Sequence, residues 1–158
     1  MQTGVKVGDC MQQSLAVIRG EASLFEVAKK MKATKVGSLL VVDDKKNPFA
    51  IITERDIVWK ALAKGSTKQK AKAIASRPLM TTAPEADISE AAKVMRDRDV
   101  KRLVVAKEGK VVGIISEKDI VRISPSLFDL ISEEERAGWK PEQLARLEKA
   151  RKSLVLPG

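Results

Sequence analysis

Apolar and polar positions follow the same order of periodicities twice along this chain. Each copy begins with apolar residues at the i, i+3, i+4, i+7 spacing of an amphipathic helix, namely Leu24, Val27, Ala28 and Met31, then Ile88, Ala91, Ala92 and Met95. A capping box is predicted to open each helix, Ser23-x-x-Glu26 in the first copy and Asp87-x-x-Glu90 in the second. The pattern therefore predicts one amphipathic helix near the start of each copy.

The residues after each helix change to the pattern of strands. Short apolar runs at residues 38–42 and 102–106 predict strands, and the polar segments 43–48 and 107–110 predict the turns of hairpins. Extended pieces are expected before each helix, at residues 15–18 and 79–82. Each copy should thus contain a strand, a helix, two strands and a second helix.

The third predicted strand of each copy runs directly into the second helix. Residues 50–58 and 113–121 are apolar runs that stop at a hydroxyl residue, Thr53 or Ser116, with an aspartate three positions later, Asp56 or Asp119. Such a hydroxyl is a good N-cap, and an acid at the third helical position reaches back to it. One such junction would indicate only a helix cap, but two in the same context also suggest a binding site. If the acids were only first-turn residues, removing either would cost about 0.3–1 kcal/mol.

The two copies align residue by residue. Glu21 matches Glu85 at an offset of 64, and Ile51 matches Ile114 at an offset of 63. A copy of about 60 residues has little core of its own, so the two sheets should pack against each other. We therefore predict a first repeat (1–63), a basic connector that is partly helical (64–77), a second repeat (78–123) and a helical C-terminal extension (124–158).

Composition narrows the function classes. The 158 residues include no histidine and a single cysteine, Cys10, which disfavours histidine-based catalysis, disulfides and zinc sites. We find no catalytic constellation and expect a protein that is not an enzyme and requires no metal. No membrane-spanning run or signal-peptide pattern is evident, so we expect no membrane association and a cytoplasmic location.

The formal net charge of +9 suggests an anionic partner. Nucleotide phosphates, RNA and an acidic protein all satisfy that charge, and so does a solvated, lysine-rich surface with no partner. Aromatic residues make up 3% of the chain, which disfavours a base-stacking platform. RNA or ribosome association through the connector and the C-terminal extension is the alternative function, and a steep loss of affinity with salt would identify it.

The doubled junction, with the same elements around it, resembles a stand-alone tandem pair of CBS domains of archaeal or prokaryotic type. CBS domains are regulatory modules named after cystathionine β-synthase. The resemblance covers roughly residues 5–123. It implies an α/β (α+β) fold of two β-α-β-β-α repeats that pack sheet to sheet about a pseudo-twofold axis. It also implies two clefts that bind AMP, ADP, ATP or S-adenosylmethionine, and a homodimer.

The resemblance also assigns ligand contacts. The ribose ligands would be Asp56 and Asp119, and Thr53 and Ser116 would contact phosphate. Within or near the motifs, four basic residues would neutralise phosphate charge: Arg55, Lys101, Arg102 and Lys118. A helix N-terminus suits phosphate because its N–H groups are unpaired and its dipole end is positive.

The two implied clefts differ in sequence. A threonine often lines the base pocket in the family; the second copy has Thr81 there, whereas the first has Val17. The basic pair Lys101–Arg102 corresponds to the uncharged residues 37–38 in the first copy. We therefore expect the cleft of the second junction, with Arg102 and Lys118, to bind a phosphorylated adenosine ligand more tightly. Because a cleft of this family can draw residues from both repeats, the alternative is that Arg102 serves the other cleft. The expected function is an adenosine-ligand sensor that signals to an unidentified protein or through its assembly state.

Overall fold

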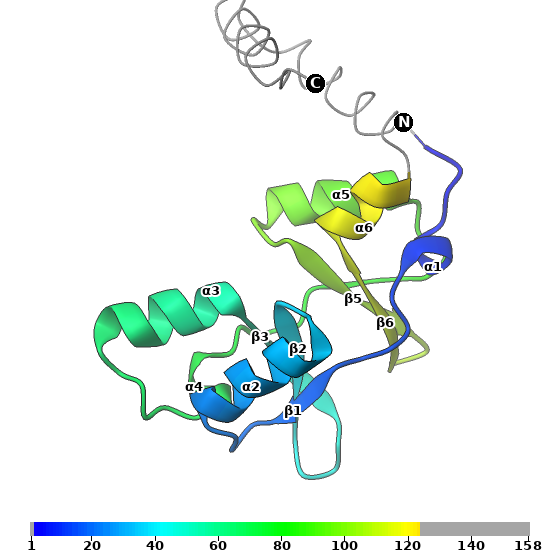
Figure 1. The fold of residues 1–158 in the computed structure, drawn as a ribbon. Helices are drawn as coiled ribbons and strands as arrows, with labels where there is room; N and C mark the ends of the chain where they lie inside the picture. The colour runs from blue at the N-terminus through cyan, green and yellow to red at the C-terminus, as the bar shows by residue number, and fades with distance from the viewer. Residues whose placement is uncertain (1, 124–158) are drawn as a thin grey trace, which may run out of the picture. The chain divides into compact units, whose positions relative to one another are not determined.

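The structure, a computed structural model, describes residues 2–123 and contains two three-stranded sheets, one in each repeat (Figure 1). In both sheets the first strand is parallel to the second, and the second is antiparallel to the third. The strands are β1 (Val17–Arg19), β2 (Ser38–Val42), β3 (Pro48–Thr53), β4 (Thr81–Thr82), β5 (Arg102–Lys107) and β6 (Lys110–Ser116). The predicted order of elements is confirmed in both repeats.

The first helix of each repeat begins at the predicted N-cap. Ser23 caps α2 (Leu24–Thr34) in a reciprocal capping box with Glu26. Asp87 caps α5 (Ile88–Asp97), but the predicted box with Glu90 is wrong, because the Asp87 carboxylate bonds Ser89 and the N-terminal residues instead. Two of the hydrogen-bond donors to Asp87, Thr3 and Gly4, thus lie more than 80 residues away in sequence, and a local motif does not reveal them.

The second helices differ between the repeats. In the first repeat, α3 (Glu54–Asp56) continues into a π-helical turn, η1 (Ile57–Ala61), and a 3-10 turn, η2 (Leu62–Lys64). In the second repeat, α6 (Glu117–Ile123) is a regular α-helix. A π-turn widens the helix locally and is common at functional positions. The turn contains Lys60, whose side chain is described below.

The central strands are buried on both faces. Every residue of β2 is buried, and so are Leu103, Val104 and Val105 of β5. Leu39 and Val41 join the core with α2, while Leu40 points to the opposite face of the sheet. Burial of both faces agrees with the predicted packing of the two repeats sheet to sheet, which leaves helices on the outer faces.

The N-terminal segment (residues 3–12) packs on the second repeat, not the first. Within it, α1 (Val7–Cys10) donates backbone hydrogen bonds from Val7 and Gly8 to the carbonyls of residues 86 and 84. In the same way α4 (Ala71–Ile74), within the connector, donates from Ala71 and Lys72 to the carbonyls of residues 22 and 20. The two short helices are 64 residues apart, which is the offset of the repeat. Each of them precedes one repeat in sequence and packs on the other.

Asp87 anchors the start of the N-terminal segment. Its carboxylate accepts hydrogen bonds from Thr3 Oγ1 (2.9 Å), the Gly4 amide (2.8 Å), and the amide and hydroxyl of Ser89 (2.9 and 2.7 Å). Burial alone would raise the pKa of this carboxyl, but the hydrogen bonds from Ser89 and Thr3 hold the pKa well below its ordinary range. The ionised carboxylate therefore ties the chain start to α5.

The predicted C-terminal helical extension (124–158) lies outside the described residues. Within residues 2–123, no helix has the length and apolar content needed to cross a membrane.

Candidate functional site

At the first junction, every acceptor position of the Asp56 carboxylate has a donor. Asp56 is buried, and its Oδ2 accepts hydrogen bonds from the Thr53 amide (2.9 Å) and the Thr53 hydroxyl (3.0 Å). Its Oδ1 accepts from the Ser76 hydroxyl (3.2 Å) and forms an ion pair with Lys60 Nζ (2.7 Å). A carboxylate has about four acceptor positions, so these four donors use all of them.

The ammonium group of Lys60 likewise has an acceptor for each of its protons. Besides the ion pair with Asp56, its ammonium group donates to the Ser76 hydroxyl (2.9 Å) and to the Ile74 carbonyl (3.1 Å). An ammonium has three protons, and each has an acceptor here. Lys60 therefore joins Asp56 to the connector. We call Asp56 and Asp119, the aspartates of the two strand-to-helix junctions, the signature aspartates.

The second junction has the same cap but a weaker third contact. Asp119 is buried, and its Oδ2 accepts from the Ser116 amide (2.9 Å) and hydroxyl (2.6 Å). Its Oδ1 accepts from the side-chain amide of Gln12 (3.0 Å). Among the described residues no cation pairs with Asp119, and three of its four acceptor positions are used. The capping geometry predicted at both junctions is confirmed.

Sequence reasoning missed Gln12, Ser76 and Lys60. Gln12 and Ser76 are 64 residues apart, which is the offset of the repeat, and each donates to the Oδ1 atom of one signature aspartate. Extending the alignment backward from Glu21 and Glu85 would have paired them. Lys60 had the weaker signal of an i, i+4 relation to Asp56, and the matching residue of the second copy is Ile123, which carries no charge.

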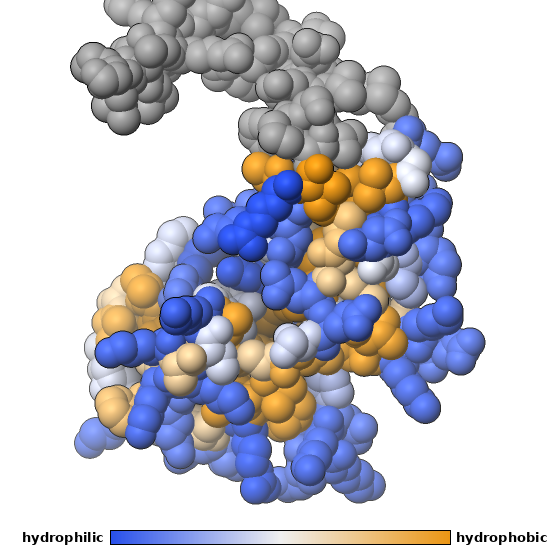
Figure 2. Space-filling view, turned by 45° about the vertical axis from the view of Figure 1, so that its right-hand side comes forward, coloured by the Kyte–Doolittle hydropathy of each residue, from blue (hydrophilic) through white to orange (hydrophobic). Residues whose placement is uncertain are grey.

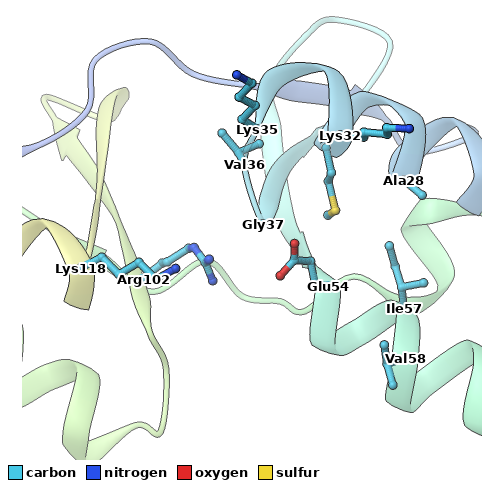
Figure 3. Close-up of a pocket in the computed structure, with 11 residues that line it drawn as sticks. Ala28, Lys32, Lys35, Val36, Gly37, Glu54, Ile57, Val58, Arg102 and Lys118 are labelled. Atoms are coloured by element: carbon cyan, nitrogen blue, oxygen red, sulfur yellow. The ribbon is translucent and has the colours of Figure 1, made fainter. Parts of the chain in front are cut away.

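A pocket of about 540 Å³ lies between the two repeats (Figure 3). Four basic residues and one acidic residue line it together with an apolar wall: Lys32, Lys35, Arg102, Lys118, Glu54, Ala28, Met31, Val36, Gly37, Ile57 and Val58. Its volume falls within the range of about 300–1,000 Å³ that is typical of small-molecule sites. The excess of positive charge makes it suited to an anion.

Arg102 and Lys118 reach this pocket from the second repeat, whereas the other walls belong to the first. Figure 3 shows the side chain of Arg102 extended toward the carboxylate of Glu54. The sequence placed both cations in the cleft of Ser116 and Asp119, but neither of those residues lines the pocket. Arg102 pairs with Ser116 in the antiparallel ladder of β5 and β6, and its side chain also lines the pocket whose other walls come from the first repeat.

Gly37 allows this close approach. A Cβ atom at this position would lie 3.0 Å from Glu54 Oε2 and 3.1 Å from Arg102 Nη2, so a larger residue would push one of these groups away. A side chain at this position would need the ends of Glu54 and Arg102 to shift by a few tenths of an ångström, and Gly37 has no positive φ, so space and not backbone conformation is what the glycine provides.

The remaining predicted residues lie apart from the pocket. The Arg55 guanidinium lies 5.3 Å from the centroid of the Trp59 ring, a cation–π contact on the exposed side of the helix. Val17 and Thr81 occupy matching edge-strand positions, paired with Leu40 and Val104. Lys101 is exposed, and its backbone carbonyl accepts from the Glu117 amide. The structure thus brings Arg102 and Lys118 together but not the whole predicted set.

Cys10 belongs to α1 on the second repeat. Partial burial raises the pKa of its thiol, and the negative charges of Asp9 and Asp119 raise it further. Among residues 2–123, no group of three or more His, Cys, Asp or Glu side chains is placed to hold a metal ion.

Comparison with known proteins identifies both repeats. The family model of the CBS domain matches residues 7–62 and 71–126. An uncharacterised protein of Methanopyrus kandleri is 34% identical over 133 residues, which is 82% of this chain and 68% of that protein. The second matched region begins inside the connector, where α4 packs on the first repeat.

Solved structures are similar to the chain in the same region. An uncharacterised conserved protein of Pyrococcus horikoshii superposes with a TM-score of 0.74 and 25% identity, covering 78% of this chain and 94% of that one. The CBS domain pair of protein MJ0100 was crystallised in complex with 5′-methylthioadenosine and S-adenosyl-L-methionine. It superposes with a TM-score of 0.69 and 26% identity, covering 75% of this chain and 94% of that one.

Proposed function

Because this chain belongs to the CBS-domain family and carries two CBS domains in tandem, we propose that it is a non-enzymatic, cytoplasmic module that senses an adenosine ligand. The ligand class is AMP, ADP, ATP or S-adenosylmethionine. Binding would be signalled to a partner protein or through the assembly state.

The observation that carries the proposal is the pair of buried signature aspartates at the strand-to-helix junctions. Asp56 and Asp119 are ionisable groups held in place by the hydroxyl and amide of the residue three positions earlier. A carboxylate fixed in this way needs no further ordering to accept a ribose hydroxyl. Within residues 2–123, Asp119 keeps one acceptor position open, whereas the donors to Asp56 already use all of its positions. The hydroxyl of Thr53 or Ser116 lies beside each carboxylate.

Two further observations support the proposal: the first supports the adenosine group of the ligand, and the second supports an anionic group such as phosphate. The related domain pair of MJ0100 has been crystallised with two adenosine compounds. In this chain the pocket with Arg102 and Lys118 offers positive charge between the repeats, and Lys118 directly precedes Asp119 in α6. Arginine and lysine are the residues that contact phosphate most readily.

We expect the purified protein to bind at least one of AMP, ADP, ATP and S-adenosylmethionine with micromolar-range affinity. Isothermal titration calorimetry with each of the four measures it directly. A ligand at about 100 times its dissociation constant adds roughly 2.7 kcal/mol of stability, so a thermal-shift assay should respond as well. No heat and no thermal shift with any of the four ligands would remove the basis of the sensor function.

We also expect a homodimer in which the helices of the first repeat contribute to the interface. Apolar surface is exposed in several places on the face shown in Figure 2. On α2, η1 and η2 the exposed side chains are Phe25, Val58, Trp59 and Leu62, with Phe25 77% and Trp59 63% exposed. Aromatic residues are enriched in the centres of interfaces because they bury large areas.

Light scattering at tens of micromolar should give twice the chain mass of 17.3 kDa. Trp59→Asp should shift the mass toward the monomer, whereas Thr67→Asp, at another exposed position, should not. A monomer mass for the wild-type protein would contradict the dimer.

A further inference from the structure

The two signature aspartates differ in the acceptor positions that their carboxylates leave open to a ligand. Asp56 has four donors, one of which is the Lys60 cation, whereas Asp119 has three neutral donors and no cation among the described residues. We propose that Lys60 acts as a built-in occupant of the first site, so that the protein binds one adenosine ligand per chain, at Asp119. This inference rests on the proposed function and adds a residue that sets the number of sites.

Lys60 holds its position through contacts that a ribose cannot replace easily. Its ammonium bonds Asp56 Oδ1, the Ser76 hydroxyl and the Ile74 carbonyl, and the Asp56 carboxylate is buried. A ligand hydroxyl that approached Asp56 would have to displace a charged donor with a neutral one. Hydrogen bonds between charged partners are roughly twice as strong as neutral ones, so that exchange is unfavourable. The first site is therefore closed by the chain itself.

At Asp119, replacing the protein's hydrogen-bond donor by a ribose hydroxyl costs little free energy. The only donor to Oδ1 among the described residues is the neutral amide of Gln12, and that side chain is exposed. A first ribose hydroxyl can use the open acceptor position, and a second can replace the amide. One neutral donor then replaces another, and the displaced amide returns to water at little cost.

The second repeat has no cation at the position that corresponds to Lys60. The position that corresponds to Lys60 in the second repeat is Ile123, so the repeat itself does not require a cation there. Lys60 also lies in the π-helical turn η1, whereas α6 is regular. The π-helical turn and the ion pair between Lys60 and Asp56 thus occur at the same place in the first repeat.

The test is the number of ligands bound per chain, measured by calorimetry with AMP, ADP, ATP and S-adenosylmethionine in turn. Wild-type protein should bind one ligand per chain. Lys60→Met keeps the apolar stem but removes the charge, and it should bind two. Lys60→Arg keeps the cation and should stay at one, and Lys64→Met, which removes an exposed charge nearby, should also stay at one. Circular dichroism and thermal unfolding show whether each variant is folded.

A double variant locates the new site. Adding Asp56→Asn to Lys60→Met should return the count to one, because the acceptor that Lys60 had covered is then lost. Two ligands per wild-type chain, or one ligand in folded Lys60→Met, would overturn the role of Lys60 while leaving the sensor function in place. No binding in any of these proteins would overturn the sensor function itself.

Discussion

Asp119→Ala is expected to weaken adenosine-ligand binding by about 100-fold. The variant removes the carboxylate that would accept the ribose hydroxyls, and a hydrogen bond to a charged group contributes roughly 1.5–3 kcal/mol. Two such bonds amount to about 3 kcal/mol or more, and each 1.4 kcal/mol corresponds to a factor of ten in affinity. Calorimetry with the ligand that binds the wild-type protein measures the loss.

Asp56→Ala is the matched comparison, because it removes the corresponding residue of the first repeat. It should change the affinity by less than about threefold, since Lys60 already covers the first site. Both titrations should be made well below the unfolding temperature of each variant. Equal losses in the two variants, or a larger loss in Asp56→Ala, would assign the ligand to the first junction instead.

Asp56→Ala should instead have the larger effect on stability, about 2–4 kcal/mol. The variant removes the acceptor of four donors and leaves the Thr53 and Ser76 hydroxyls and Lys60 without it. The Lys60 side chain is 42% exposed and can turn to water, which keeps the cost below that of a fully buried pair. Asp119→Ala keeps the Ser116 cap but removes the acceptor of three neutral donors, so about 1–2 kcal/mol is expected.

Urea unfolding of the two variants at neutral pH compares these costs. A double-mutant cycle with Lys60→Met isolates the ion pair: the combined variant should be less destabilised than the sum of the single ones. If Asp56→Ala cost only about 0.3–1 kcal/mol, the carboxylate would be acting as a first-turn acid alone. That lower figure is the expectation from sequence alone, which does not include the contacts of Ser76 and Lys60.

The sequence predicted the local structure of the repeats well because the signals are local. The apolar spacing of Leu24, Val27 and Met31 places the helix, and all three are buried. The strand at Ser38–Val42 and both junction caps at Thr53 and Ser116 follow from side-chain size and hydrogen-bonding groups within a few residues. The failure at Asp87 has the opposite cause, because its hydrogen-bond donors Thr3 and Gly4 come from the start of the chain.

The candidate site was only partly predictable. Arg102 and Lys118 were identified as cations for an anionic ligand, and the structure places both in one pocket. Their assignment to a particular cleft was not available from sequence, because residues of one repeat can line a pocket whose other walls belong to the other repeat. Gly37, which makes room for Arg102 beside Glu54, had appeared only as an uncharged counterpart of Lys101.

By itself, the sequence determined the doubled β-α-β-β-α pattern, the family resemblance and the two signature aspartates, because hydrophobic periodicity and capping act over three or four residues. Only the tertiary structure decided which hydrogen-bond donors reach each aspartate. Packing brings Ser76 and Lys60 to Asp56, and it brings Gln12, from 107 residues away, to Asp119. The two carboxylates therefore differ in free acceptor positions and in neutralising charge, although their motifs are nearly the same. A contact between distant segments depends on the folded path of the whole chain, and no short motif encodes it.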